Sequence, residues 1–236
     1  MHRLVSRMTA EALGTLALIY FGCAVVVAKP FFGSGNYGLM GVALVHAVVL
    51  GVMITATMSV SGGHLNPAVT LGLLSIKRIA PREAAAYVLA QLAGAALGAL
   101  LLKYTFPAGV TSIGTLGTPE LANSMNLMTG TVLEAVLTFF LMSAVMGTAV
   151  NPDAPKVGGF AIGLVLFFDI MVAGTLTGAA MNPARWFGPA LASGHLDNWF
   201  VWIIGPLLGA AVAAAIYRGV LAEDADLART PASPEP

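Results

Sequence analysis

The sequence has 236 residues, of which 58% are hydrophobic and only 9% are charged. A soluble domain carries about 25% charged residues, so this composition indicates an integral membrane protein. The formal net charge is zero, which gives no sign of a nucleic-acid partner. The single cysteine, Cys23, excludes an intrachain disulfide and a multi-cysteine metal site, and we predict no metal and no cofactor.

Apolar stretches long enough to cross a membrane recur along the whole chain. They lie at about 9–28, 38–60, 84–104, 126–150, 157–175 and 198–217. Two arginines precede the first stretch, as in a signal peptide, but the stretch continues to Ala28 and predicts a retained transmembrane helix. The sequence therefore predicts an all-α integral membrane fold.

Basic residues are unevenly distributed over the connections between these stretches, and this asymmetry predicts that both termini are cytoplasmic. On that topology the outside receives only Lys29 and Lys103. The inside receives Arg3, Arg7, Lys77, Arg78, Arg82, Lys156, Arg218 and Arg229.

Two segments, 61–70 and 177–186, run from small residues into Asn-Pro-Ala and then into an apolar stretch. Asparagine is a preferred N-cap, because its side-chain oxygen accepts from a first-turn amide, and proline suits the first helical position. We expect a helix to begin at Asn66 and another at Asn182. Each side-chain NH2 would then be free to donate outward, at the positive end of its helix dipole.

Both of these helices are expected to be short, about 66–74 and 182–191. At about 1.5 Å per residue, such a helix crosses only half of a ~30 Å hydrocarbon core. The remaining residues of the motifs are Pro67, Ala68, Pro183 and Ala184.

The two halves of the chain read as a repeat within a single domain, about 8–105 and 126–218, with a disordered tail at 223–236. A glutamate, Glu11 or Glu134, opens each half. Three helices per half would invert the second copy relative to the first. A carboxylate inside a membrane needs partners, and we expect both to accept hydrogen bonds from the loops before the half-helices. A proton relay is the alternative role.

The paired motifs, with Arg185 directly after the second, resemble the aquaporin (major intrinsic protein) family. The resemblance extends from about Ala10 to Tyr217. It implies a channel rather than an enzyme, with six transmembrane helices and two half-helices that meet at mid-membrane, usually assembled as a homotetramer.

The resemblance also places a selectivity filter by spacing from the motifs. Four positions are implied: His46, Ile170, Ala179 and Arg185. This combination is similar to filters of plant tonoplast intrinsic proteins, and it favours passage of water together with ammonia, hydrogen peroxide or urea. Arg185 is a permanent cation that would repel cations, including hydronium.

A glycerol facilitator is the alternative channel type. That branch usually has Asp after the motif arginine, where this chain has Trp186, and Ala190 occupies a position that is often basic there. Both residues favour the water branch. Water channels more often carry Trp at the position of Ile203, so glycerol permeation stays an alternative.

The conduction mechanism expected from these residues is passive. Asn66 and Asn182 would donate to a central water and orient its hydrogens away in both directions, which interrupts a proton wire. Backbone carbonyls would form the remaining acceptors of an apolar pore. They belong to Gly62, Gly63, His64, Ala179, Ala180 and Met181.

Asp169, inside the fifth apolar stretch, has no assigned role. Intramembrane acids are candidates for function, and adjacency to Ile170 turns Asp169 about 100° away from the pore on a helix. A hydrogen-bonded structural role is one interpretation, and a proton pathway in a proton-coupled secondary transporter is the other. A prokaryotic plasma membrane is the expected location, with a vacuolar or other intracellular membrane as the alternative.

Overall fold

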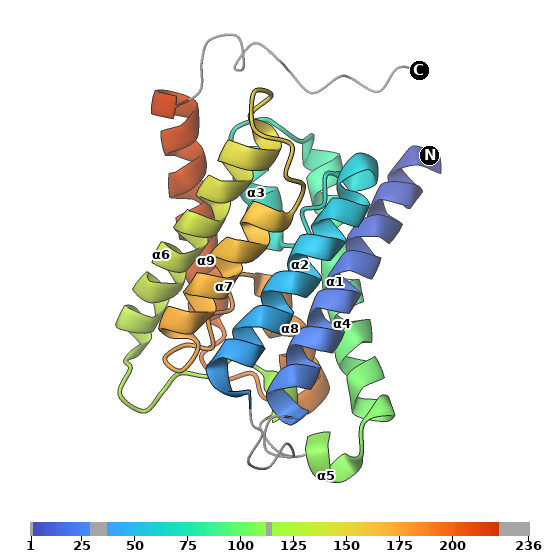
Figure 1. Ribbon diagram of the computed structural model, residues 1–236, viewed down its shortest axis with the longest axis vertical. Coiled ribbons are helices and arrows are strands. Elements are labelled where there is room, and N and C mark those ends of the chain that lie inside the picture. Colours follow the sequence, from blue (N-terminus) through green and yellow to red (C-terminus); the bar gives the residue numbers. More distant parts are fainter. Residues whose placement is uncertain (1, 29–36, 112–114, 222–236) are drawn as a thin grey trace.

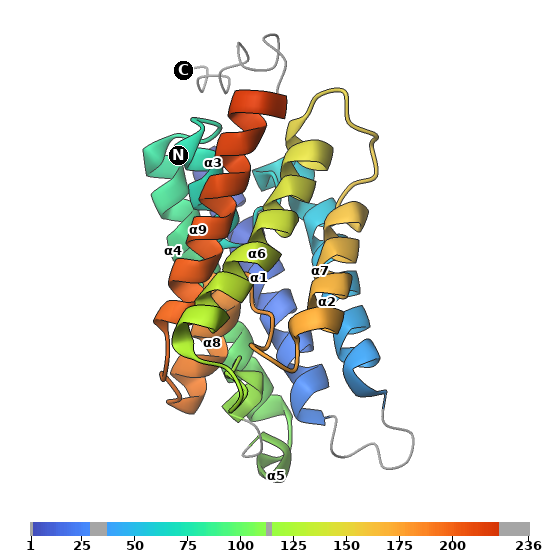
Figure 2. The same cartoon turned by 90° about the vertical axis from the view of Figure 1, so that its left-hand side faces the viewer.

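The computed structural model describes residues 2–28, 37–111 and 115–221, and all regular secondary structure in these ranges is helical. The long helices run side by side along the long axis of the molecule (Figures 1 and 2). They are α1 His2–Ala28, α2 Gly38–Ser61, α4 Pro81–Thr105, α6 Leu127–Val145, α7 Phe160–Ala173 and α9 Phe200–Ile216. Shorter helices are α3 Pro67–Ser75, α5 Ala108–Thr111 and α8 Pro183–Ser193.

Brief non-α turns complete the helical elements. A single 3-10 turn covers Thr115–Gly117, and π-helical turns at Met146–Val150 and Tyr217–Leu221 continue α6 and α9. The predicted tail at 223–236 lies outside the described residues, as do Lys29 and Arg229.

Among the described residues, five helices are long and apolar enough to cross a membrane, and α7 is shorter, with 14 residues. The predicted stretch at 157–175 is longer than α7, and a glycine flanks the helix at each end. Gly159 is the N-cap, and the N–H of Gly174 closes the last turn on the carbonyl of Ile170. At 1.5 Å per residue α7 spans about 21 Å.

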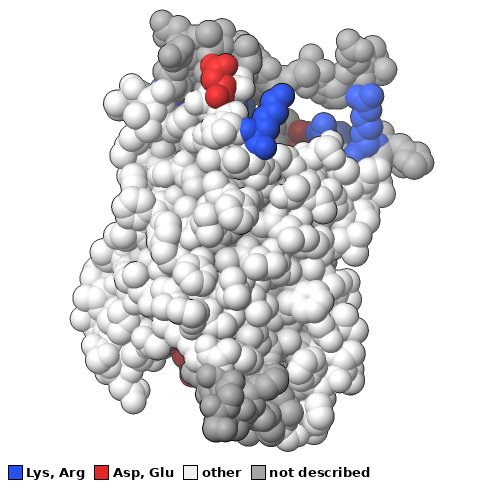
Figure 3. Space-filling view, in the orientation of Figure 1, with Lys and Arg blue, Asp and Glu red and all other residues white. Residues whose placement is uncertain are grey.

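On the visible surface, charged side chains lie toward the ends of the molecule (Figure 3). On the face shown in Figure 3, lysines and arginines gather at the end of the molecule where α1 begins and α9 ends in Figure 1, and the middle is almost free of charged side chains. Large apolar side chains such as Leu89 and Val172 are exposed. An uncharged apolar belt between charged ends is the surface that a bilayer requires.

The helix pairs α1–α4 and α6–α9 pack closely through glycines. A Cβ atom added to Gly94 would lie 2.2 Å from the carbonyl oxygen of Ala12, and one added to Gly209 would lie 2.1 Å from that of Ala135. Membrane helices approach closely where small residues meet, and these positions accept no larger side chain.

The two short helices α3 and α8 lie inside the bundle and enter it from opposite ends (Figures 1 and 2). Helix α3 packs against α9 and α4, and α8 packs mainly against α4. Their N-termini, with the polar loops that precede them, therefore meet in the interior of the molecule.

Candidate functional site

Both short helices begin as their sequences predict, with an asparagine N-cap followed by proline. The side chain of Asn66 accepts from the amide of Ala68, at 2.8 Å. The side chain of Asn182 accepts from the amides of Ala184, at 2.9 Å, and Arg185, at 3.3 Å. Both asparagines are almost fully buried, so the caps hold two amide groups at fixed positions in the interior.

The two asparagines also cross-link the half-helices. Asn66 Nδ2 donates to the carbonyl of Met181, and Asn182 Nδ2 donates to the carbonyl of Leu65, each at 2.9 Å. The expectation that each NH2 is wholly free is therefore wrong, because one of its two hydrogens is used by the opposite loop. The second hydrogen is the one that remains for a ligand.

The carbonyl of Met181 does not belong with the other predicted acceptors, because it faces Asn66. Leu65 and Met181, each directly before an asparagine, have positive φ angles of 50° and 52°. Non-glycine residues in this region cost about 1–3 kcal/mol each, and here the conformation directs their carbonyls to the opposite asparagine.

The buried glutamates hold the loops in this conformation. Glu11 accepts from the amides of His64, at 2.9 Å, and Leu65, at 2.6 Å. Glu134 accepts from the amides of Ala180, at 2.9 Å, and Met181, at 2.7 Å. Each also accepts from a hydroxyl of its loop, Ser61 or Thr177. The two glutamates thus provide hydrogen-bond acceptors for loop amides that would have none in lipid.

Gln91 in α4 supports the first loop and was not singled out from the sequence. Its Nε2 donates to Glu11 Oε2, at 2.8 Å, and to Thr70 Oγ1, at 2.9 Å. The second loop has a different support, since Trp202 Nε1 donates to the carbonyl of Thr177 at 2.9 Å. A glutamine inside an apolar helix was the available signal for Gln91.

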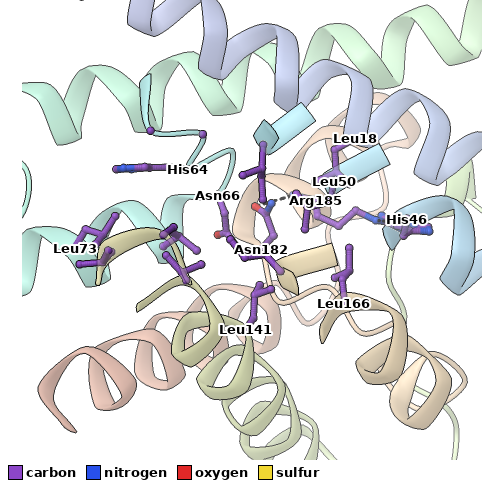
Figure 4. Close-up of a pocket in the computed structure, with 18 of the residues that line it drawn as sticks. Leu18, His46, Leu50, His64, Asn66, Leu73, Leu141, Leu166, Asn182 and Arg185 are labelled. Atoms are coloured by element: carbon purple, nitrogen blue, oxygen red, sulfur yellow. Dashed lines mark hydrogen bonds between the residues drawn. The ribbon is translucent and has the colours of Figure 1, made fainter. Parts of the chain in front are cut away.

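A cavity of about 260 Å³ runs through the centre of the bundle past both asparagines. One water needs roughly 10–15 Å³ of such space, so the cavity accommodates several. Figure 4 shows His64 and Leu73 on one side of Asn66 and Asn182, and Arg185 with His46 on the other. Its apolar wall includes Leu18, Leu50, Ile54, Val69, Leu141, Ile162 and Leu166.

Five of the six predicted carbonyl residues line this cavity, and Met181 does not. The lining members are Gly62, Gly63, His64, Ala179 and Ala180.

Arg185 and His46 meet at one end of the cavity and are nearly fully buried. Arg185 Nε donates to His46 Nε2 at 3.3 Å, and the guanidinium also donates to the carbonyl of Gly117 at 2.9 Å. His46 Nδ1 lies 2.8 Å from the carbonyl of Val42. The contacts fit a neutral imidazole that carries its hydrogen on Nδ1 and accepts at Nε2.

The other two predicted filter residues are placed differently. Ala179 lines the cavity beside Arg185. Ile170 is buried on α7 one turn beyond the cavity-lining Leu166 and is not part of the cavity wall. Asp169 is also buried, and its Oδ2 has no hydrogen-bond partner among the described residues.

Comparisons with known proteins agree with this arrangement. The family model described as major intrinsic protein matches residues 2–217. Aquaporin TIP4-4 of Zea mays is 40% identical over 226 residues, covering 92% of this chain and 86% of the relative. Aquaporin AqpM of Methanothermobacter marburgensis is 34% identical over 243 residues, covering 93% and 99%.

A solved structure has the same fold. The aquaglyceroporin from Plasmodium falciparum superposes with a TM-score of 0.84, covering 95% of this chain and all of that one, at 24% sequence identity. Proteins of the family that the matching family model and the relatives indicate are membrane channels rather than enzymes. The chain belongs to the major intrinsic protein family, as the resemblance of its paired motifs indicated.

Proposed function

We propose that the central cavity is a passive pore that conducts water and small neutral solutes and excludes protons and cations. One observation carries this proposal. Asn66 and Asn182 lie next to each other on the wall of a cavity that is otherwise lined mainly by apolar side chains. A water at this point finds donors on one side and hydrocarbon on the other. Its orientation is therefore set by the protein.

Proton exclusion follows from that orientation. Each asparagine keeps one N–H for a passing water, whose oxygen is held while its hydrogens point away along the pore. The half-helices α3 and α8 add the positive ends of their dipoles at the same place. A continuous proton wire is interrupted there, and a cation meets a positive potential.

The filter is proposed at Arg185, His46 and Ala179, with Ile170 behind the cavity wall. Arg185 is held by two acceptors, Gly117 and His46, so its charge stays at one fixed side of the passage. Ala179 leaves space, and this space supports passage of ammonia, hydrogen peroxide or urea beside water. The backbone carbonyls of the lining loop residues would accept from these solutes.

The proposed pore includes the motif residues, the acids that support the loops and the filter residues. The motif residues are Asn66, Pro67, Ala68, Asn182, Pro183 and Ala184, and the supporting acids are Glu11 and Glu134.

Stopped-flow light scattering on proteoliposomes tests the solute range. Vesicles would be challenged in turn with an impermeant osmolyte, glycerol, urea and an ammonium gradient. We expect fast shrinkage, no re-swelling in glycerol and a rapid ammonia-driven pH change. Rapid glycerol re-swelling would instead support the glycerol-facilitator alternative, which Ile203 keeps open.

A proton-coupled secondary transporter is the second candidate, and Asp169 is the observation that favours it. A buried carboxylate with one unpartnered oxygen is a candidate proton carrier. This candidate predicts saturable uptake that responds to a pH gradient. The channel predicts flux that is linear in solute concentration and independent of that gradient.

The assembly and membrane also belong to the proposal. We expect a homotetramer and cytoplasmic termini, the latter supported by the basic residues at that end of the molecule. The archaeal relative is compatible with a prokaryotic plasma membrane, whereas the plant relatives favour the vacuolar alternative.

A further inference from the structure

A cluster of titratable side chains lies away from the pore, beyond the C-terminal end of α8. His195 Nε2 lies 3.5 Å from Glu120 Oε1, and His195 Nδ1 lies 3.7 Å from Asp197 Oδ2. The imidazole is about one-third exposed, so it exchanges protons with the solution at this face of the molecule. Histidine is the side chain that ordinarily changes charge between pH 5 and 8.

The cluster is connected to the filter through residues 115–120, which we call the filter segment. Glu120 Oε1 accepts from Thr115 Oγ1 at 2.6 Å, and the carbonyl of Thr115 accepts from Thr118 Oγ1 at 2.5 Å. Between them, the carbonyl of Gly117 accepts from the Arg185 guanidinium at 2.9 Å. One short segment therefore contacts His195 at one point and Arg185 at another.

The filter segment is held at several further points. Thr118 Oγ1 lies 3.4 Å from Ser193 Oγ, which also accepts from the amide of His195 at 3.3 Å. On its inner side, Gly117 has φ of +72° and packs on Cys23, where an added Cβ would come within 3.1 Å of the Cys23 Cα atom. A shift of the segment is thus transmitted to the carbonyl that holds Arg185.

We propose that Glu120 and His195 are positioning residues for Arg185, and that protonation of His195 tightens the contact between the filter segment and the end of α8. A neutral imidazole can donate to only one of the two carboxylates, whereas an imidazolium donates to both and pairs with their charge. The tightened segment keeps the Gly117 carbonyl on Arg185 and keeps the guanidinium against the pore wall. This inference rests on water conduction through the pore.

The charged groups in the region of His195 come from different parts of the chain. Glu120 faces it from the filter segment and Asp197 from its own loop. Lys103 of α4 donates from its Nζ to the carbonyl of Ala192 at 3.0 Å, at the negative end of the α8 dipole.

The test is osmotic water permeability of proteoliposomes at about pH 5.5 and about pH 8, with equal pH on both sides, for wild type and His195→Gln. Dividing wild type by the variant at each pH removes any titration of the buried His46. We expect the ratio of wild-type to variant water permeability to be near one at the higher pH and about two at the lower pH. A twofold change is the size that a partly exposed ion pair allows. Raising the salt concentration should shrink the difference.

Further variants separate positioning from a general structural role. Glu120→Gln should abolish the pH dependence of the ratio, and Asp153→Asn, at a remote exposed acid, should leave it intact. The same ratio at both pH values, or a pH dependence that survives Glu120→Gln, would overturn the proposal. Wild-type permeability equal to that of empty liposomes would instead contradict water conduction itself, so the two failures are distinguishable.

Discussion

At the scale of single residues, Arg185 and its partner His46 determine how the proposed pore excludes cations. A permanent cation is buried at the end of the cavity, and among the described residues its hydrogen-bond acceptors are a backbone carbonyl and a neutral imidazole rather than a carboxylate. Neutral acceptors leave the guanidinium without a hydrogen-bonded counter-charge. A positive charge held in this way in a low-dielectric passage opposes cations.

Replacing Arg185 by Ala should widen the passage and remove this barrier. We expect urea permeability to rise about tenfold, the effect of about 1.4 kcal/mol on a barrier, together with a measurable proton leak. Solute re-swelling and an entrapped pH dye would report both. Arg218→Ala, at the exposed end of the chain, is the control, and an unchanged urea permeability in Arg185→Ala would contradict the assigned filter.

Gly22 should matter because it leaves room for the His46 ring. A Cβ atom at Gly22 would lie 2.7 Å from His46 Nε2, so Gly22→Ala must displace the imidazole that accepts from Arg185. We expect water permeability to fall about fivefold, the effect of about 1 kcal/mol on the barrier. Gly147→Ala, with open space at its Cβ position, should have wild-type permeability. Equal permeability of the two variants would argue against a filter role for His46.

The sequence predicted these residues unequally well. The family resemblance, applied by spacing from the motifs, predicted His46, Ala179 and Arg185 as filter residues, and all three line the cavity, while their filter role stays a prediction. Gly117 could not be found, because its contribution is a backbone carbonyl from a loop without a motif. Ile170 shows the limit of spacing arguments, since it lies on the expected helix but not on the cavity wall.

At the scale of elements, the same arrangement of a glutamate and an asparagine stabilises each of the two half-helices. An intramembrane glutamate accepts from two consecutive loop amides, and an asparagine caps the helix that follows. Composition and cap preferences predicted the starts of both helices. The crossed bonds between Asn66 and Asn182 and the opposite loops needed the three-dimensional arrangement.

Glu134→Gln should destabilise the second loop. The amide replaces one acceptor oxygen by a donor, which then faces the N–H groups of Ala180 or Met181. One unsatisfied buried donor costs about 1–3 kcal/mol. The apparent melting temperature in detergent should fall by several degrees, and less in Asp169→Asn, whose Oδ2 has no partner to lose. A larger fall in melting temperature for Asp169→Asn than for Glu134→Gln would contradict the assignment of Glu134 as the acid that stabilises the loop.

Gly209→Ala should separate α9 from α6. Its Cβ atom would lie 2.1 Å from the backbone carbonyl oxygen of Ala135, which cannot move alone. Overpacking of this kind costs about 1–3 kcal/mol. Thermal unfolding in detergent measures the loss, with Gly219→Ala, where the added atom meets nothing within 4 Å, as the control. Equal stability of the two variants would contradict the close contact.

At the scale of the whole molecule, the two halves place equivalent parts on either side of the central asparagines. Helices α3 and α8 enter from opposite ends, and the pairs α1–α4 and α6–α9 pack in the same manner (Figures 1 and 2). The sequence predicted this plan from two motifs and two glutamates. It did not predict the short α7, because hydropathy alone does not show where a helix ends within an apolar stretch.

The central claim is that water passes beside Ala179 and Arg185, and a thiol introduced at Ala179 tests it most directly. Wild type should resist a mercurial, because Cys23 is fully buried and outside the cavity wall. Ala179→Cys should conduct water, lose most of its osmotic permeability on labelling and recover it with a reducing thiol. Full labelling of this variant without loss of water flux, or strong block of wild type that Cys23→Ser abolishes, would contradict the account.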